Sequence, residues 1–208
     1  MADKRLSLEA YEAILRLIGS GVLPKDAKLD EAKLGEIFGM SRTPIREAIG
    51  RIESEKIAKR KGRLLVVSEQ TSHEVGEIFF ALRMLEPKCA RAAAYTRSHS
   101  AGLHYRKHIE FDETGTNPLG AFSELRQAYV GLLMAACPNT VMAKTIQVMR
   151  NRLLVLAPLY APSDLHSELG AMLQAIASGN AEAGARTCLT VIQAEEALLL
   201  KAMKDRDV

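Results

Sequence analysis

The sequence lacks the residues and patterns that mark secreted, membrane-spanning or disulfide-rich proteins. Its three cysteines, Cys89, Cys137 and Cys188, are odd in number and far apart, so they offer neither a disulfide framework nor a CxxC metal motif. We interpret them as small buried residues. No apolar run approaches the roughly 18 residues of a transmembrane helix, and the opening residues lack the apolar segment of a secretory signal. We therefore expect a cytoplasmic protein without a membrane partner.

Catalytic signatures are also absent. The chain has no Ser-His-Asp order, no glycine-rich phosphate loop and no HExxH motif, and its five histidines lie in ordinary contexts. We predict that the protein is not an enzyme and uses no cofactor.

What is present is a large apolar fraction and an uneven distribution of charge. The 208 residues are 48% apolar, which is enough for one large core or two small ones. The net charge is +3, but residues 1–67 carry 14 Lys and Arg against 10 Asp and Glu, and the remainder carries 14 against 15. The excess of positive charge therefore lies in the first third of the chain, which favours a polyanionic partner, although a charge run alone is as typical of a solvated helix face.

Two helices are predicted before residue 40. Apolar residues at i, i+3, i+4 and i+7 indicate a first amphipathic helix: Tyr11, Ile14, Leu15 and Ile18. The segment "GSGVLPKD" ends it. Asp30 is a suitable cap for a second, short helix that Gly39 ends. Three residues are expected to form its apolar face: Leu34, Ile37 and Phe38.

A third helix follows almost at once. Ser41 is a good N-cap, and Pro44 fits the first turn, where a backbone N–H has no partner to lose. Its apolar stripe again has helical spacing: Ile45, Ala48, Ile49 and Ile52. With this stripe turned inward, the arginines and hydroxyls of the first two turns are left on other faces.

The next residues predict a small basic hairpin. Two β-prone runs flank Lys61 and Gly62, a plausible tight turn. Two helices, a glycine turn, a third helix and a hairpin are the layout of a winged helix-turn-helix, which we assign to residues 1–68.

From residue 71 the pattern is helical throughout. "TSHE" predicts a capping box at the start of a long helix that continues past Pro87. Further helices are expected near 101–111, 119–136, 140–156, 163–178 and 181–203, with Ser163 and Asn180 as N-caps. We therefore predict a mainly α protein whose second domain, residues 71–208, is an antiparallel all-α bundle of six or seven helices.

The third helix has the chemistry of a DNA-recognition helix. The N-terminal end of such a helix enters the major groove, where Arg can bind guanine bidentately and Ser or Thr can bind phosphates or bases. Basic residues on the hairpin would meet phosphates or the minor groove. The candidate DNA contacts are Lys33, Ser41, Arg42, Thr43, Arg46, Lys61, Gly62 and Arg63.

These residues also carry a resemblance. The stretch "AILRLIGSGVLPKDAKLDEAKLGEIFGMSRTPIREAIGRIESEKIAKRKGR" resembles the winged-helix domain of the GntR family of bacterial transcription regulators. "EIFFALRMLEPKCARAAA" and the helices after it resemble the FCD-type effector domain of the FadR subfamily. The resemblance implies a homodimer on a palindromic operator, with a small molecule in the helical domain altering DNA affinity. It also implies DNA contacts by Ser41, Arg42, Thr43 and Arg46 and by the wing residues 61–63, although Leu64 replaces a glycine found in many members.

The resemblance does not extend to the metal site of many FCD domains. The family pattern D-x-x-F-H corresponds here to "RQAYV", which places Arg126 and Val130 at the first two ligand positions, and Leu169 and Val191 at those of later histidines. Because these side chains do not ligate Zn²⁺, we predict that the metal site is absent. His104 and His108, spaced i and i+4, are the alternative metal ligands, although such a pair is more often solvated.

Without a metal, an anionic effector needs a positive anchor. Arg83 and Arg126 are the candidates, with Tyr129 and Arg152 lining the same cavity, and a carboxylate such as an organic acid is the ligand that arginine suits. The alternative is that these arginines pair with acidic neighbours.

The sequence as a whole predicts a homodimeric, effector-responsive DNA-binding regulator, with repression as its expected action. One alternative is a helical ligand-binding or protein-interaction module that does not act primarily on DNA. Another is a metal-dependent version of the same sensor.

Overall fold

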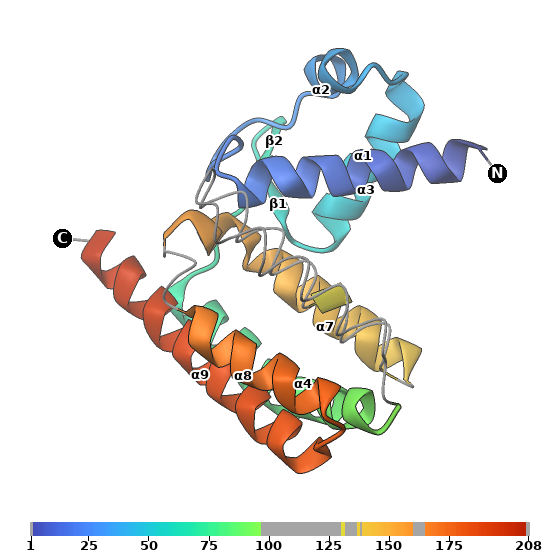
Figure 1. Cartoon of the computed structure of the whole chain (residues 1–208). Helices are drawn as coiled ribbons and strands as arrows, with labels where there is room; N and C mark the ends of the chain where they lie inside the picture. The colour runs from blue at the N-terminus through green and yellow to red at the C-terminus, as the bar shows by residue number, and fades with distance from the viewer. Residues whose placement is uncertain (1, 97–129, 132–136, 138, 160–164, 207–208) are drawn as a thin grey trace, which may run out of the picture. The chain divides into compact units, whose positions relative to one another are not determined.

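The computed structural model describes residues 2–96, 130–131, 137, 139–159 and 165–206 (Figure 1). The chain forms two compact units. The first contains residues 1–70 together with 151–158, and the second contains residues 71–150 and 159–208. The sequence analysis predicted domains at 1–68 and 71–208 and did not foresee the inclusion of 151–158 in the first unit.

The first unit is a winged helix-turn-helix, as predicted. It contains α1 (Ala2–Gly19), α2 (Glu31–Phe38), α3 (Arg42–Ser54), β1 (Ala58–Lys61) and β2 (Leu64–Val67). Helix α3 packs against both α1 and α2. The apolar stripes of α1 and α3 form the core, and four of their isoleucines are completely inaccessible to solvent: Ile14, Ile18, Ile45 and Ile52.

Helix α2 begins and ends at the expected residues. The Asp30 carboxylate accepts hydrogen bonds from the backbone N–H groups of Ala32 and Lys33, and Gly39 ends the helix with φ = 62°. The predicted apolar face is only partly correct, because Ile37 is 57% exposed while Leu34 is buried. A helix of eight residues crosses its neighbour over too short a length to bury all three positions.

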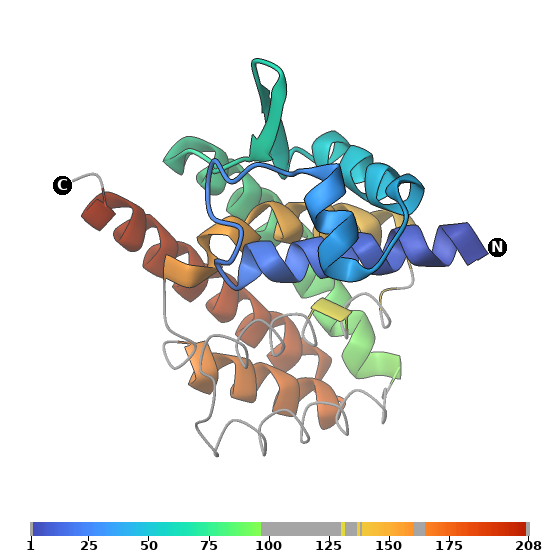
Figure 2. The ribbon, with the colours of Figure 1, turned by 90° about the horizontal axis from the view of Figure 1, so that it is seen from above.

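The wing is a two-stranded antiparallel hairpin with Lys61 opposite Leu64. Its two-residue loop has Gly62 at φ = 63°, a conformation that a tight hairpin turn requires and glycine adopts without strain. Leu64 therefore begins β2 rather than disrupting the turn. Residues 26–29 also add backbone hydrogen bonds to the outer side of β2, including Leu29 N–H to Leu65 O at 2.9 Å. Figure 2 shows the hairpin extending beyond helices α1 to α3.

The second unit is helical in its described part. Its elements are α4 (Ser72–Thr96), most of α7 (Thr140–Arg152), α8 (His166–Ala177) and α9 (Ala181–Arg206), while the 3-10 helix η1 (Leu154–Leu159) begins in the first unit. Helices α4 and α8 both pack on α9. The predicted helix at 101–111, the N-cap Ser163 and most of the predicted helix at 119–136 lie outside the described residues.

Two predicted caps of the second unit are confirmed. Thr71 and Glu74 form the capping box at the start of α4: the Thr71 N–H and hydroxyl donate to the Glu74 carboxylate, and the Glu74 N–H donates back to Thr71 Oγ1. The Asn180 side chain accepts from the backbone N–H of Ala183 at the start of α9. Among the described helices, none has the length and apolar character to cross a bilayer.

Candidate nucleic-acid interface

Helix α3 separates an apolar face from a cationic one. Its buried residues are Pro44, Ile45, Ala48, Ile49 and Ile52. Arg42, Thr43 and Arg46 are exposed, and all three lie in the first two turns. The sequence-based candidates on this helix are therefore brought together at its N-terminal end, which also carries the positive pole of the helix dipole. Such a surface suits an anionic ligand.

Ser41 occupies the N-cap position but does not act as the cap that its type suggests. Its backbone is extended, and its side chain makes no capping hydrogen bond. The hydroxyl is exposed beside Arg42 and Thr43. This corrects the expected capping role and leaves the hydroxyl with the other polar groups of the surface.

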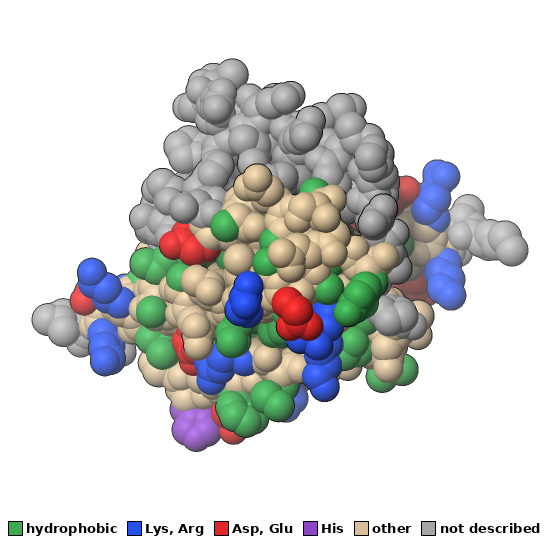
Figure 3. All heavy atoms as spheres, turned by 60° about the horizontal axis from the view of Figure 1, so that its bottom comes forward, with side chains coloured by type: hydrophobic (Ala, Val, Ile, Leu, Met, Phe, Trp, Pro, Cys, Tyr) green, Lys and Arg blue, Asp and Glu red, His purple; other side chains and the backbone are tan. Residues whose placement is uncertain are grey.

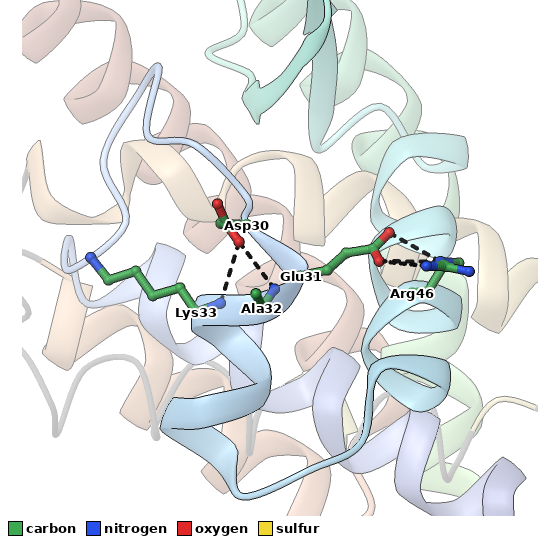
Figure 4. A network of polar contacts seen from close by, with 5 residues as sticks. All are labelled: Asp30, Glu31, Ala32, Lys33 and Arg46. Atoms are coloured by element: carbon green, nitrogen blue, oxygen red, sulfur yellow. Dashed lines mark hydrogen bonds and ion pairs between the residues drawn. The ribbon is translucent and has the colours of Figure 1, made fainter.

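Arg46 is held from the preceding helix. Its Nε donates to both oxygens of Glu31, at 3.2 and 3.1 Å, and its Nη2 donates to Glu31 Oε2 at 3.0 Å (Figure 4). These hydrogen bonds raise the pKa of Arg46 above its already high value, so the guanidinium is always charged. The Arg46 side chain is still 69% exposed. Glu31 thus fixes one edge of the guanidinium and leaves the other edge open, an arrangement that the sequence analysis did not foresee.

Lys33 belongs to the same region. Figure 4 shows its side chain extending away from α2, on the opposite side from the Glu31 and Arg46 pair. Its backbone N–H is bound by Asp30, whose pKa is lowered chiefly by a hydrogen bond from Lys28, at 2.7 Å, and further by the backbone donors. The ionised Asp30 therefore anchors the start of α2 and the backbone of Lys33.

The wing supplies a second basic surface. Lys59, Arg60, Lys61 and Arg63 are all exposed. Arg60 pairs with Glu53 at 2.8 Å, and Lys61 lies 3.5 Å from Asp26. Lys59 and Arg63 make no ion pair with any residue that the structure describes. The tip of the hairpin is therefore cationic on balance.

A polar network holds the back of α3 to the rest of the unit. The Tyr11 hydroxyl of α1 donates to Glu55, which follows α3, and accepts from Asn151 Nδ2 at 2.8 Å. Arg51 lies 3.8 Å over the Tyr11 ring and pairs with Glu55 at 2.8 Å. Burial, followed by the hydrogen bond to Glu55, strongly raises the pKa of Tyr11. The network ties the C-terminal end of α3 to α1, at the other end of the helix from Arg42 and Arg46.

Two family models match this chain. The model of the bacterial regulatory proteins of the gntR family matches residues 6–64, and the FCD domain model matches residues 77–194. The chain belongs to the GntR family of bacterial regulators. It is a DNA-binding transcription regulator with an FCD effector domain, and its family is not one of enzymes.

Individual relatives agree with this assignment for parts of the chain. Gluconate operon transcriptional repressors of Bacillus licheniformis and Bacillus subtilis are 39% and 34% identical over 77 residues, which is 37% of this chain. The match spans only 31% of either repressor's length. Among solved structures, E. coli McbR/YncC has a TM-score of 0.79 at 19% identity, covering 94% of this chain and 97% of that one. A putative GntR regulator from Rhodococcus sp. RHA1 has a TM-score of 0.69 at 16% identity, with the same coverage of both chains. These two structures establish the fold.

The candidate effector residues of this GntR-family regulator are not brought together in the described part of the chain. Arg126 and Tyr129 lie outside it. Arg83 is partly buried and donates to Glu196 on α9. Arg152 donates to the Gln70 side chain inside the first unit, a partner that the sequence did not indicate.

The bundle also contains a buried ion cluster that sequence reasoning missed. Arg150, only 2% exposed, donates from Nε and Nη2 to the two oxygens of Glu86, both at 2.6 Å, and from Nη1 to Glu195. The two glutamates come from α4 and α9 and are themselves buried. No periodicity argument identifies such a group, because an arginine on an amphipathic helix is normally expected on the solvent side.

The structure describes three of the residues at the family's metal-ligand positions. Val130 is an apolar residue that is only partly exposed. Leu169 and Val191 are buried apolar residues in α8 and α9. Within the described ranges, no three His, Cys, Asp or Glu side chains form a group that could hold a metal ion. Arg126, His104 and His108 lie outside those ranges, so the absence of a metal site stays a prediction.

Proposed function

We propose that this regulator is a repressor that binds a palindromic operator as a homodimer and loses or gains operator affinity when its FCD domain binds a small carboxylate. The observation that carries the proposal is the exposed cationic end of α3, where Arg42, Thr43 and Arg46 project from a helix whose opposite face is buried. Repression, rather than activation, is supported by the two gluconate operon repressors. Their sequence similarity to this chain covers a segment of 77 residues.

In this proposal α3 reads the bases. Arg42 and Arg46 bind guanine edges in the major groove, and the Ser41 and Thr43 hydroxyls bind phosphates or bases. The open edge of the Arg46 guanidinium supports a bidentate contact, since Glu31 already holds the other edge.

The flanking basic residues bind the backbone. Lys61 and Arg63 contact phosphates or the minor groove from the wing, with Gly62 allowing the close approach, and Lys33 contacts a phosphate from α2. These contacts add affinity without adding base specificity.

The proposed effector is a carboxylate such as an organic acid. Arg126 and Tyr129 are its principal contacts, because Arg83 is already engaged by Glu196 and Arg152 by Gln70. Arg83 joins the site if the effector displaces Glu196.

The DNA contacts are tested on an operator selected from genomic fragments with the purified protein. Arg46→Ala should weaken operator binding by about ten- to a hundredfold and relax specificity at one base pair, measured by fluorescence anisotropy. Lys61→Ala should weaken binding to all sequences and reduce the salt slope by about one. Lys144→Ala, an exposed lysine of α7, is the control. Unchanged binding by both test variants would show that the contacts are misassigned.

The effector class is tested separately by thermal shift with a panel of organic acids. A ligand that binds only the native protein raises its apparent stability. The same acid should change operator retardation, and Arg126→Ala should abolish both effects. If every stabilising ligand is a cation or a neutral molecule, the carboxylate proposal is wrong.

A further inference from the structure

The three cysteines of the chain, which are far apart in the sequence, come close together in the helical unit. Cys89 lies on α4, Cys137 lies shortly before α7, and Cys188 lies on α9. All three are free thiols, and none is more than 8% exposed. Their burial confirms the interpretation from the sequence. Spacing along the chain does not reveal that the three thiols are neighbours in the fold.

Helices α4 and α9 bring Cys89 and Cys188 to the same level of the bundle. The two helices pack together and run antiparallel, because residue numbers rise along α4 and fall along α9 in three contacts between them: Arg83 with Glu196, Ala90 with Gly184, and Arg91 with Glu182. Each of the two cysteines lies between the first and the second of these contacts. Both side chains are completely inaccessible, in contrast to the charged side chains of both signs that Figure 3 shows on one face of the molecule.

The Cys89 and Cys137 thiols contact each other directly. A hydrogen bond joins their side chains, and Cys137 Sγ also donates to the backbone oxygen of Asn139 at 3.3 Å. Because a thiol carries one proton, Cys137 uses its own on Asn139 and accepts that of Cys89. Cys188 acts on Cys89 electrostatically and more weakly than Cys137 does. The two sulfurs that are placed to form a bond are therefore those of Cys89 and Cys137.

The two thiols of this pair differ in their access to reagents. Cys137 is 8% exposed, whereas Cys89 is completely buried. Burial first, and then the hydrogen bond to Cys137, raises the pKa of the Cys89 thiol. Since the thiolate is the reactive form of cysteine, Cys89 is a poor first nucleophile toward a reagent from solvent. Cys137 is therefore the sulfur that an oxidant reaches first, and Cys89 is held beside it as the second.

We propose that Cys137 and Cys89 are a redox-active thiol pair, which a small hydroperoxide such as hydrogen peroxide converts to a disulfide. The Cys137 sulfur attacks the peroxide, the O–O bond breaks, and the products are a sulfenic acid on Cys137 and one water. The Cys89 sulfur then attacks the sulfenic sulfur, the S–S bond forms, and the S–O bond breaks to release a second water. An external dithiol restores both thiols by exchange and is itself oxidised to a disulfide.

The bond would join α4 to the start of α7. Asn139 begins α7: its side chain accepts from the Met142 N–H and its backbone oxygen accepts from the Ala143 N–H, both at 3.0 Å. Near its other end, α7 is already held to α4 by Arg150, which donates to Glu86 at 2.6 Å. The disulfide therefore fixes α7 to α4 at both ends. Because the disulfide is uncharged, it adds no buried charge beside the Glu86 carboxylate.

The pairing is tested on the reduced, full-length protein with hydrogen peroxide as the probe. After oxidation, the remaining thiols are alkylated in denaturant and the protein is digested and analysed by mass spectrometry. We expect a peptide pair linked through Cys89 and Cys137, a mass loss of two hydrogens per chain, and alkylation of Cys188 only. The absence of a linked peptide, a link through Cys188, or a link between two chains on a non-reducing gel overturns the proposal. The test uses neither DNA nor effector, so its result is independent of the proposed function.

The order of the two steps is tested with variants. Cys89→Ala should stop the reaction at the sulfenic acid, which dimedone then labels at Cys137, whereas the wild type should be labelled at least about tenfold less because Cys89 consumes that intermediate. Cys188→Ala is the matched control: it also removes a buried thiol but should still form the Cys89–Cys137 link. Circular dichroism checks that each variant is folded. Equal dimedone labelling of the wild type and Cys89→Ala overturns the role of Cys89.

The structural effect of the bond is measured by thermal unfolding of the oxidised and reduced wild type. The oxidised protein should have an apparent Tm about 5–15 °C higher, because the bond restricts the unfolded chain between residues 89 and 137. Dithiothreitol should return the Tm to that of the reduced protein. A Tm that falls in the linked protein overturns the inferred clamp of α7 on α4, because the bond would then oppose the native packing.

Discussion

At the scale of single residues, the bond between Glu31 and Arg46 determines how the recognition helix presents its charge. A free arginine side chain samples many rotamers and loses that freedom when it binds a base. Glu31 holds Nε and Nη2, so the remaining donors are already ordered before DNA arrives. The carboxylate also places a negative charge close to a surface that meets phosphates. Glu31 should therefore increase base specificity while reducing non-specific affinity.

We expect Glu31→Gln to lower the ratio of operator to random-duplex binding. Operator affinity should fall by about fivefold as Arg46 loses its ordered partner, while binding to random duplex should hold or rise because a negative charge has gone. Anisotropy titrations with both duplexes measure the ratio. Glu36→Gln, an exposed glutamate of the same helix, is the control. An unchanged ratio would mean that Glu31 does not position Arg46 on DNA.

Sequence reasoning identified the chemistry of this surface better than its geometry. Arg42, Thr43 and Arg46 were predicted to be exposed because the apolar stripe of α3 excludes them from the core, and they are. The role of Ser41 as a side-chain cap was wrong, because residue type fixes the preference for a cap but not the rotamer. The partner of Arg46 was missed because Glu31 is distant in sequence, and pairing between separate helices depends on their packing.

At the scale of the elements, Tyr11 joins three segments of the first unit. Its hydroxyl connects α1 to Glu55 at the end of α3 and to Asn151 near the end of α7. Tyr11→Phe keeps the ring and its contact with Arg51 but removes both hydrogen bonds. We expect a loss of about 1–3 kcal/mol in the free energy of unfolding, because Asn151 and Glu55 are left without that partner. Chemical denaturation measures the loss, and Tyr95→Phe, at an exposed tyrosine, should change little.

The same tyrosine gives a dependence on alkaline pH. Its pKa is raised in the folded protein, by burial first and then by the hydrogen bond to Glu55, whereas an unfolded chain releases the proton near pH 10. Above about pH 10 the unfolded state therefore binds fewer protons than the folded state, and stability falls as pH rises. Tyr11→Phe should flatten this decline relative to the wild type, as followed by denaturation at a series of pH values. Parallel curves for the two proteins would contradict the role of Tyr11.

The elements themselves were predictable where one strong pattern controls them. Three helices of the first unit follow from apolar spacing and caps, and the hairpin follows from a glycine between β-prone runs. The backbone pairing of residues 26–29 with β2 was not predicted, because "DAKL" has no alternation and its bonds are made through the main chain. Arg150 was missed for a related reason: its burial depends on two glutamates that only the packed helices bring close.

At the scale of the whole molecule, the chain passes between the two units more than once. It leaves the first unit after residue 70, returns at residue 151 and leaves again after residue 158. Within this returning segment, Leu153 and Leu156 are completely buried. The FCD match at 77–194 therefore contains residues that pack with the DNA-binding unit. The chain returns to the first unit between two neighbouring residues. Arg150 is bound to Glu86 and Glu195 in the second unit, and Asn151 is bound to Tyr11 in the first.

We expect Arg150→Met to destabilise both units. Removing the guanidinium leaves the Glu86 and Glu195 carboxylates buried without their cation, which costs about 3–5 kcal/mol in the second unit. Because the helix that carries residue 150 also supplies residues to the first unit, unfolding of the second unit releases a segment that the first unit buries. Hydrogen exchange should therefore show faster exchange in α1 and α3 as well as in α4 and α9. Lys144→Met, at an exposed position of α7, should leave both unchanged. Exchange that accelerates only in α4 and α9 would mean that the first unit is stable without its returning segment, and that a signal from the effector domain must reach the DNA by another route.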